Sequence, residues 1–224
     1  IPLRSGSKRI KDKNIKSFNN KPLFYYSIKV ALDSKLFDKV IISSDSKKYL
    51  DLVKDEFKSN RKLVYIIRPS KISKSLSSTE LAISHTLESN LIFENIFLIQ
   101  ATSPILQKND LIDGFKKFER NKLDSLFSCY LSSSFIWSYK NNNLRSENYN
   151  YKKRPMSQKF KNKKIIENGA YYIFKYEKYL KFKNRLFGKI GFFEMNKYFS
   201  IDIDSNKDFK LAEYIVKNLK FYKN

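Results

Sequence analysis

The sequence predicts an α/β fold with a mostly parallel sheet in three layers. Short apolar runs, such as residues 40–42 and 96–99, alternate with segments that carry apolar residues at helical spacing. Continuous apolar runs are typical of parallel strands buried on both faces, and their alternation with helices favours an α/β/α arrangement. Polar loops follow Leu3, Ile67 and Ile99, where the carboxyl ends of such strands would place a ligand site.

Each element is predicted from its apolar spacing and its flanking residues. Pro22 is expected near the first turn of the first helix, Ser46 to cap the second, and Ser205 or Asn206 to cap the last. Residues 139–164 are rich in Asn, Lys, Arg and Tyr, which predicts a long loop, a lid or a dimer arm. The expected strands are 40–42, 63–67, 96–99, 125–130, 169–174, 192–195 and 198–203, and the expected helices are 21–34, 46–58, 79–89, 109–121, 177–182 and 208–219.

The composition fits one domain, residues 1–224, with a sizeable core. With 42% hydrophobic residues the chain is too apolar to be disordered. The formal charge of +23 raises the alternative of a nucleic-acid-binding module. The cations are spread along the whole chain instead of gathering on one face, which favours compositional drift over a nucleic-acid footprint.

A few features of the sequence bear on the cellular compartment and on the start of the first strand. No stretch of about 18 apolar residues and no signal peptide is found, so no membrane partner is expected. The single Cys129 cannot form an intramolecular disulfide, which suits a cytoplasmic protein, and we expect it to be a small buried strand residue. Because Ile1 falls inside a predicted strand, we expect that strand to begin before it.

The first loop has the chemistry of a phosphate site. Residues 1–14, IPLRSGSKRIKDKN, pass from an apolar start into a polar loop with one glycine, two serines and five cations. Backbone N–H groups and small side chains can approach phosphate oxygens closely, while Arg and Lys neutralise their charge. The loop has no complete P-loop or dinucleotide motif, so an ordinary solvated basic loop is the alternative.

Two aspartates form a candidate metal site near the end of the chain. Asp202 and Asp204 follow an apolar stretch, and the period of a strand would place both carboxylates on one face. Two oxygen ligands suit Mg²⁺, which binds through one or two carboxylates and substrate phosphates. The alternative is a turn at the end of the strand in which Asp204 caps the next helix. Gln100, at the carboxyl end of another strand, is a candidate contact for a ribose hydroxyl or a base edge.

Several motifs together resemble the acylneuraminate cytidylyltransferases, the CMP-sialic acid synthetase family. Residues 1–14 resemble its N-terminal signature, IPARGGSKRIPGKN, with Ser5 in place of a glycine and Lys11-Asp12 in place of Pro-Gly. The stretch SIDIDSNKDFKLAE resembles its terminal signature. Further similar segments are QATSPIL from Gln100, RP at residues 68–69 with SST at 77–79, RPMSQ at 154–158 and ENGAYY at 167–172. Met156 and Ser157 replace arginines of the family.

The resemblance implies a Rossmann-like nucleotide-diphospho-sugar transferase fold and a reaction. CTP and a nonulosonic acid of the sialic, legionaminic or pseudaminic type would give the CMP-sugar and pyrophosphate, with Mg²⁺ required. It also implies a cytoplasmic homodimer formed through residues 131–164. The alternatives are a cytidylyltransferase for the eight-carbon 3-deoxy-manno-octulosonate, which is disfavoured because its phosphate loop lacks the SKRI…KN pattern, and the nucleic-acid-binding module.

The resemblance also implies a role for each matched residue. Arg4, Ser7, Lys8 and Arg9 are assigned to the triphosphate, and Lys13 and Asn14 to the α-phosphate and ribose. Arg68, Thr79 and Gln100 are assigned to the nucleoside, Asp202 and Asp204 to the metal, and Gln100, Arg154 and Asn168 to the sugar. Arg4, Lys13 and Asp202 are the candidate catalytic residues.

Overall fold

The central layer consists of two hydrogen-bonded sheets. The computed structural model describes residues 1–58, 60–74, 77–88, 93–156, 159–160 and 162–218. The first sheet has the order β1-β4-β5 and is parallel: β1 (Pro2–Leu3), β4 (Val40–Ser44) and β5 (Leu63–Ile67). The second has the order β11-β7-β10-β6: β11 (Ile190–Glu194), β7 (Ser125–Ser132), β10 (Lys164–Lys175) and β6 (Asn95–Ile99). In it β11 is parallel to β7, whereas β10 is antiparallel to both β7 and β6.

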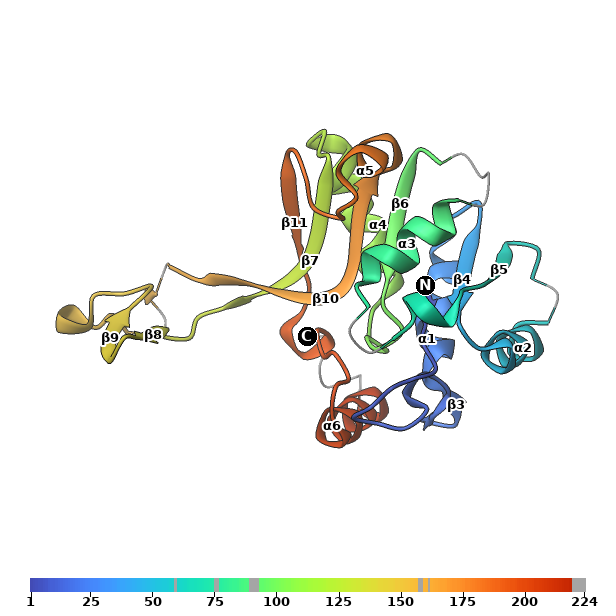
Figure 1. Cartoon of the computed structure of the whole chain (residues 1–224). Coiled ribbons are helices and arrows are strands. Elements are labelled where there is room, and N and C mark those ends of the chain that lie inside the picture. The colour runs from blue at the N-terminus through green and yellow to red at the C-terminus, as the bar shows by residue number, and fades with distance from the viewer. Residues whose placement is uncertain (59, 75–76, 89–92, 157–158, 161, 219–224) are drawn as a thin grey trace.

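Helices cover both faces of this layer (Figure 1). Along β10, Tyr171 and Ile173 pack in a core that includes residues of α1 (Leu23–Ser34), α2 (Lys47–Glu56) and α4 (Lys108–Arg120). Their neighbours Tyr172 and Phe174 pack in a second core with residues of α3 (Thr79–Leu87) and α5 (Tyr176–Phe182). Because alternate residues of a strand point to opposite faces, this division confirms the predicted three layers.

The helix caps also follow the prediction. Ser46 accepts a hydrogen bond from the N–H of Tyr49 at the start of α2. At the start of α6 (Asn206–Lys217), Ser205 and Asp208 form a reciprocal capping box. The predicted ends of two helices, Ser89 and Leu219, lie outside the described residues.

The predicted strand at residues 198–203 is wrong. Lys197–Phe199 form a 3₁₀ turn that Asn196 stabilises in two ways. Its side-chain oxygen accepts from the N–H of Tyr198, and its backbone carbonyl accepts from the Ser200 hydroxyl. The chain after this turn joins no sheet ladder, and the N–H of Ile203 donates to the carbonyl of Thr102 instead. Local side-chain hydrogen bonds have therefore replaced strand pairing next to the two aspartates.

Residues 131–156, 159–160 and 162–164 form an arm that leaves the body of the molecule (Figure 1). The outer ends of β7 and β10 pair along its root, and a hairpin of β8 (Trp137–Lys140) and β9 (Asn143–Ser146) lies beyond them. The sequence predicted an irregular excursion here without the hairpin. Between arm and body β10 is bulged: from Glu167 to Tyr172 it advances five residues while its partner advances only from Cys129 to Phe127.

The loop from β1 to α1 contains short elements of its own. It includes a 3₁₀ turn, η1 (Lys13–Ile15), and a two-strand ladder of β2 (Ser17–Phe18) and β3 (Lys21–Pro22). Asn19 and Asn20 make the turn of that ladder with positive φ angles of 44° and 68°. The first helix therefore begins at Leu23, two residues later than predicted.

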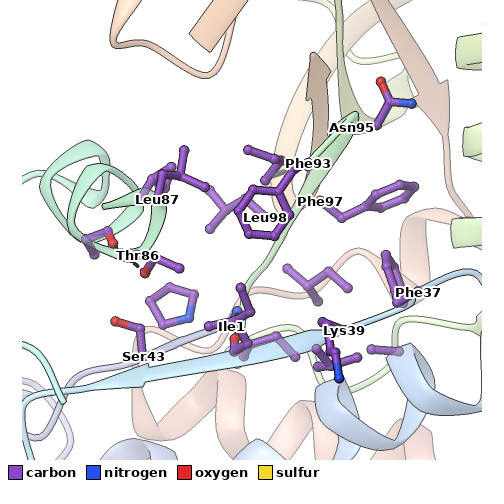
Figure 2. A pocket seen from close by; sticks show the side chains of 18 residues that line it. Ile1, Phe37, Lys39, Ser43, Thr86, Leu87, Phe93, Asn95, Phe97 and Leu98 are labelled. Carbon is purple, nitrogen blue, oxygen red and sulfur yellow. Dashed lines mark hydrogen bonds between the residues drawn. The ribbon is translucent and has the colours of Figure 1, made fainter. Parts of the chain in front are cut away.

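An apolar pocket separates the two sheets (Figure 2). It lies between β4 and β6, beneath α3, and its walls include Ile1, Leu87, Phe97 and Leu98. None of the predicted site residues lines it. Among the described residues, no helix is both long and apolar enough to cross a bilayer. Cys129 is buried in β7, as predicted.

Candidate functional site

The loop that leaves β1 is held in shape by its own polar groups. The Asn14 side chain is buried and donates a hydrogen bond to the carbonyl of Arg4, at 2.9 Å, which closes residues 4–14 into a compact loop. The Arg4 guanidinium reaches across to the carbonyl of Lys74, at 3.2 Å, in the segment that follows β5. A Cβ atom at Gly6 would meet no atom within 4 Å, so the space beside this glycine is open to a ligand.

A polar cavity of about 240 Å³ lies where this loop meets the carboxyl ends of β5 and β6. Parallel strands place ligand sites at this edge of a sheet. Its lining includes seven of the predicted nucleotide-binding residues: Arg4, Ser7, Lys13, Asn14, Arg68, Thr79 and Gln100. Lys8 and Arg9 belong to the same loop but do not line this cavity.

Arg68 is the most enclosed cation of the cavity, with only 4% of its surface exposed. Its Nε donates to the Ser73 hydroxyl at 2.8 Å, and its Nη2 lies 4.0 Å from a carboxylate oxygen of Asp45. Burial lowers the pKa of the guanidinium, and the Asp45 charge opposes this effect. Its Nη1 is buried and has no hydrogen-bond partner among the described residues, so a residue that lines the cavity carries an unused donor.

Asp204 joins the cationic loop to the last segment of the chain. Arg9 Nη1 lies 2.8 Å from one oxygen of this carboxylate, and Lys13 Nζ lies 3.3 Å from the other. Lys13 also donates to the carbonyl of Ile203, so one lysine contacts both the aspartate segment and the polar cavity. Arg9, which does not reach that cavity, is instead paired with a predicted metal ligand.

Asp202 faces a second pocket. Although its side chain is exposed, the surrounding wall removes part of its hydration, which raises the pKa of the carboxyl; a hydrogen bond with Thr102 opposes this rise. Asp204 adds a further, smaller upward effect on that pKa through its negative charge, so the two carboxylates are close enough to interact. The second pocket is lined by Tyr130, Ile166, Glu167, Asn168, Gly169, Tyr172, Ser200 and Asp202.

The Asn168 side chain lies in the wall of this second pocket and contacts several neighbouring residues. Its oxygen accepts from the Ser128 hydroxyl at 2.6 Å and from the N–H of Ala170 at 3.1 Å. Its nitrogen donates to the Ser200 hydroxyl at 2.9 Å and contacts the Met195 sulfur at 3.2 Å. These bonds give Asn168 a positioning role, and its predicted contact with a sugar stays a prediction.

The structure does not bring Arg154 to either pocket. This exposed residue lies in the arm, where its guanidinium stacks on the ring of Phe135 at 4.2 Å from the centroid. Met156 is exposed in the same region, and Ser157 lies outside the described residues.

Among the polar residues in or beside the two pockets that sequence reasoning missed are Asp45, Thr102 and Glu167. Asp45 faces Arg68, Thr102 bonds to Asp202, and Glu167 lines the second pocket. Asp45 and Thr102 follow the carboxyl ends of strands, which was the available signal. Glu167 belongs to the bulged part of β10, and strand alternation gives no guide to the direction of a side chain there.

The pair of aspartates has the donor chemistry for a magnesium ion. Within the described residues no group of three or more His, Cys, Asp or Glu side chains could hold a metal by itself. Mg²⁺ is commonly bound by one or two carboxylates together with substrate phosphates, so Asp202 and Asp204 beside a phosphate-sized cationic cavity fit this mode. The other ligands would have to come from substrate and water.

The fold and the cavity define a class of protein. An α/β/α sheet with a cation-lined polar cavity at the carboxyl ends of its strands is the arrangement of a nucleotide-binding α/β protein. A sequence model of the cytidylyltransferases matches residues 1–224, and the chain belongs to this family.

Individual relatives agree with this assignment. The chain is 29% identical over 226 residues to a pseudaminic acid cytidylyltransferase of Campylobacter jejuni, covering 97% of this chain and 94% of that protein. It is 29% identical over 228 residues to an N-acylneuraminate cytidylyltransferase of Escherichia coli, covering 95% of this chain but only 50% of that protein. The solved structure of a CMP:2-keto-3-deoxy-manno-octonic acid synthetase in complex with CTP superposes with a TM-score of 0.69 at 12% identity, covering 97% of both chains, and this likeness concerns the fold.

Proposed function

We propose that the protein transfers CMP from CTP to a nonulosonic acid. The observation that carries this proposal is the polar cavity, whose wall unites Arg4, Lys13 and Arg68 from separate segments of a cytidylyltransferase chain. The anomeric hydroxyl of the sugar attacks the α-phosphorus, the new P–O bond forms on one side, and pyrophosphate leaves on the other. In such a reaction the protein mainly positions the reactants and disperses charge.

The nucleotide is assigned to the polar cavity. Arg4, Ser7 and the nearby Lys8 and Arg9 bind the triphosphate, and Lys13 and Asn14 hold the α-phosphate and ribose. The base and ribose face Arg68, Thr79 and Gln100, where the unused Nη1 donor of Arg68 meets a carbonyl of cytosine.

Magnesium is assigned to Asp202 and Asp204, where it would neutralise phosphate charge. In the structure Arg9 and Lys13 neutralise Asp204. These cations therefore exchange the carboxylate for phosphate oxygens when nucleotide and metal are both bound. Lys13 needs the smaller movement, because it already lines the nucleotide cavity.

The acid sugar is assigned to the second pocket, which Asp202 lines. The names of the relatives support a nonulosonic acid: one acts on pseudaminic acid and another on N-acylneuraminate. The eight-carbon alternative rests on a likeness of fold alone. Asn168 lines this pocket and Gln100 lines the nucleotide cavity, whereas Arg154 could reach a sugar only if the arm served a neighbouring subunit.

The protein is proposed to be a single-domain enzyme of the cytoplasm, where CTP is available. It is also proposed to form a homodimer, and the exposed side chains of the arm support this dimer. Trp137, Tyr139, Leu144, Tyr151 and Met156 expose large apolar side chains along it. Large apolar groups gathered on one projection are typical of a protein–protein contact. Sedimentation analysis should give a dimer, and Tyr139→Ser with Leu144→Ser should shift it toward monomer.

The decisive experiment measures pyrophosphate release from each of the four nucleoside triphosphates. Assays contain Mg²⁺ and sialic, legionaminic, pseudaminic or 3-deoxy-manno-octulosonic acid. We expect release with CTP only, dependent on one nonulosonic acid. The double variant Asp202→Asn, Asp204→Asn should lose at least about a hundredfold in rate, because both carboxylates are assigned to the same magnesium ion.

The matched control is Asp51→Asn with Asp113→Asn. These exposed aspartates pair with Lys54 and Lys116 on α2 and α4, so the control changes the net charge equally without touching either pocket. Release with the eight-carbon acid alone would favour the octulosonate alternative. No release with any sugar, together with DNA binding that weakens steeply with salt, would replace the proposal by the nucleic-acid-binding one.

A further inference from the structure

Two contacts fasten the phosphate loop to one neighbouring segment, the connection from β4 to α2 together with the first turn of α2. The first contact is at Ser5. Its N–H donates to Asp45 Oδ1 at 2.9 Å, and its hydroxyl donates to Asp45 Oδ2 at 2.7 Å. Both oxygens of one carboxylate are therefore engaged by a single residue of the loop, and only 12% of the Asp45 side chain is exposed.

The second contact is at Asp12, seven positions further along the chain. The Tyr49 hydroxyl donates to Asp12 Oδ1 at 3.0 Å, and Tyr49 itself is buried in the first turn of α2. Burial raises the pKa of the Tyr49 hydroxyl, and the Asp12 carboxylate raises it further, so the hydroxyl remains a donor at neutral pH. Asp12 has a φ of 52°, in the left-handed region that an aspartate adopts only at some cost in energy.

Both fastened residues stand where the signature that this loop resembles has glycine. A glycine at either position would give no side chain for the β4–α2 connection to bind, and it would leave the backbone freer. At position 12 the left-handed backbone is kept although the glycine is gone, and the carboxylate gains a partner. The substitutions and the contacts thus occur at the same two places.

Asp45 also links the loop to Arg68, another residue that lines the cavity. The carboxylate oxygen that accepts from the Ser5 N–H lies 4.0 Å from Nη2 of Arg68. The loop and the buried arginine, which both line the cavity, therefore lie against the same carboxylate. A displacement of Asp45 would move both the loop and the arginine.

We propose that Asp45 and Tyr49 are positioning residues that hold the phosphate loop in its binding conformation before the nucleotide arrives. The inference rests on the proposed function for its catalytic readout. A loop that is already ordered loses less conformational freedom on binding, so fastening it increases the affinity for CTP. Neither residue is placed in contact with the nucleotide.

The first test measures the Kd for CTP by calorimetry and the KM values for CTP and sugar. Tyr49→Phe and Ser5→Ala each remove one hydroxyl, and we expect each to weaken CTP binding by about three- to tenfold, the effect of one hydrogen bond. The KM for the sugar should stay within about twofold, because the second pocket does not include this segment. Tyr65→Phe is the control, since Tyr65 lines a separate surface pocket with Lys58 and Asn60.

Two substitutions at one position separate the hydrogen bond from the backbone. Asp12→Asn keeps an acceptor and tolerates a left-handed φ, so it should retain most of the affinity. Asp12→Gly accommodates the left-handed φ but removes the acceptor and frees the backbone, so it should weaken CTP binding at least as much as Tyr49→Phe does. Combining Asp12→Gly with Tyr49→Phe should cost no more than Asp12→Gly alone, because both remove the same bond.

The second test does not depend on the reaction. The loop carries tryptic sites at Arg4, Lys8, Arg9, Lys11 and Lys13, and cleavage there requires it to open. Ser5→Ala with Tyr49→Phe should accelerate cleavage in the loop at least tenfold without lowering the temperature of global unfolding by more than a few degrees.

The outcomes separate the two proposals. If the wild-type protein neither binds CTP nor turns it over, the proposed function is wrong, and the rate of loop cleavage alone then decides the positioning role. Unchanged CTP affinity and unchanged cleavage in the variants, equal to those of Tyr65→Phe, would overturn the inference.

Discussion

Replacing Asn168 by alanine should destabilise the whole domain and displace Asp202. The side chain is 7% exposed and makes three conventional hydrogen bonds, at 2.6, 2.9 and 3.1 Å, besides a contact with a methionine sulfur. Together they join β7, β10 and the segment that follows the 3₁₀ turn at Lys197–Phe199.

The expected loss in the free energy of unfolding follows from the hydrogen bonds that each partner of Asn168 keeps in the variant. Ser128 still donates to the carbonyl of Tyr171, and Ser200 still donates to the carbonyl of Asn196, so those hydroxyls lose one bond each and remain paired. The N–H of Ala170 loses its acceptor in a buried position, which is the most expensive change. Two net bonds of about 1 kcal/mol and one orphaned N–H of about 1–3 kcal/mol give a loss of roughly 3–5 kcal/mol.

Urea unfolding at neutral pH measures this loss. Asn109→Ala is the control, because it makes the same chemical change on the exposed surface of α4 and should alter stability by less than about 0.5 kcal/mol. In conditions where the Asn168 variant is fully folded, its pyrophosphate release should still be reduced, since Ser200 is two residues from Asp202. A loss below about 1 kcal/mol with an unchanged denaturant slope would refute the reasoning.

Three further outcomes are expected. Burial raises the pKa of the Asp110 carboxyl from its usual 3.8 to about 6, so the folded chain holds this proton to a higher pH than the unfolded chain does, and the stability of the wild type falls as the pH rises through that interval. In urea titrations the stability of Asp110→Asn should therefore rise by up to about 3 kcal/mol relative to wild type between pH 4 and 7. A difference in stability that stays constant over this range would contradict the prediction. Arg185→Met removes the partner of Glu80 at 2.6 Å, in a pair whose side chains are 17% and 26% exposed, and should cost about 1–2 kcal/mol by thermal unfolding, with Arg185→Lys in between. A Cβ at Gly114 would lie 2.2 Å from the Tyr171 hydroxyl, so Gly114→Ala should cost about 2 kcal/mol in the same assay, and adding Tyr171→Phe should recover part of it if the clash is the cause.

The layers of the fold could be predicted because they depend on the alternation of apolar residues. The run Tyr171-Tyr172-Ile173-Phe174 fills both cores, and no other pairing of faces would bury all four. The caps at Ser46 and Ser205 were predictable for a similar reason, since each satisfies N–H groups next to it in sequence. Local chemistry and burial agreed at these positions.

The parts that could not be predicted depend on partners distant in the chain. The strand expected at 198–203 has suitable residues, but the Asn196 side chain and the carbonyl of Thr102 take the N–H groups that a ladder would need. The position of Asp45 after a strand was a signal, but its contacts could not be predicted, because its partners Ser5 and Arg68 are far from it in sequence. The arm placed Arg154 away from the pockets through a stack on Phe135 that no motif encodes.

The bulge in β10 lets the arm and the body vary independently. A strand that slips by one residue turns all its side chains to the opposite face, so an insertion in the arm would normally invert the core pattern of Tyr171 to Phe174. Here the ladder is interrupted between Glu167 and Tyr172, and the pairing on the body side is fixed afresh by Phe127 and Leu98. Lengthening or shortening of the arm can therefore stop at the bulge, which makes the projection a separable module for exchange between related chains while the pockets keep their shape.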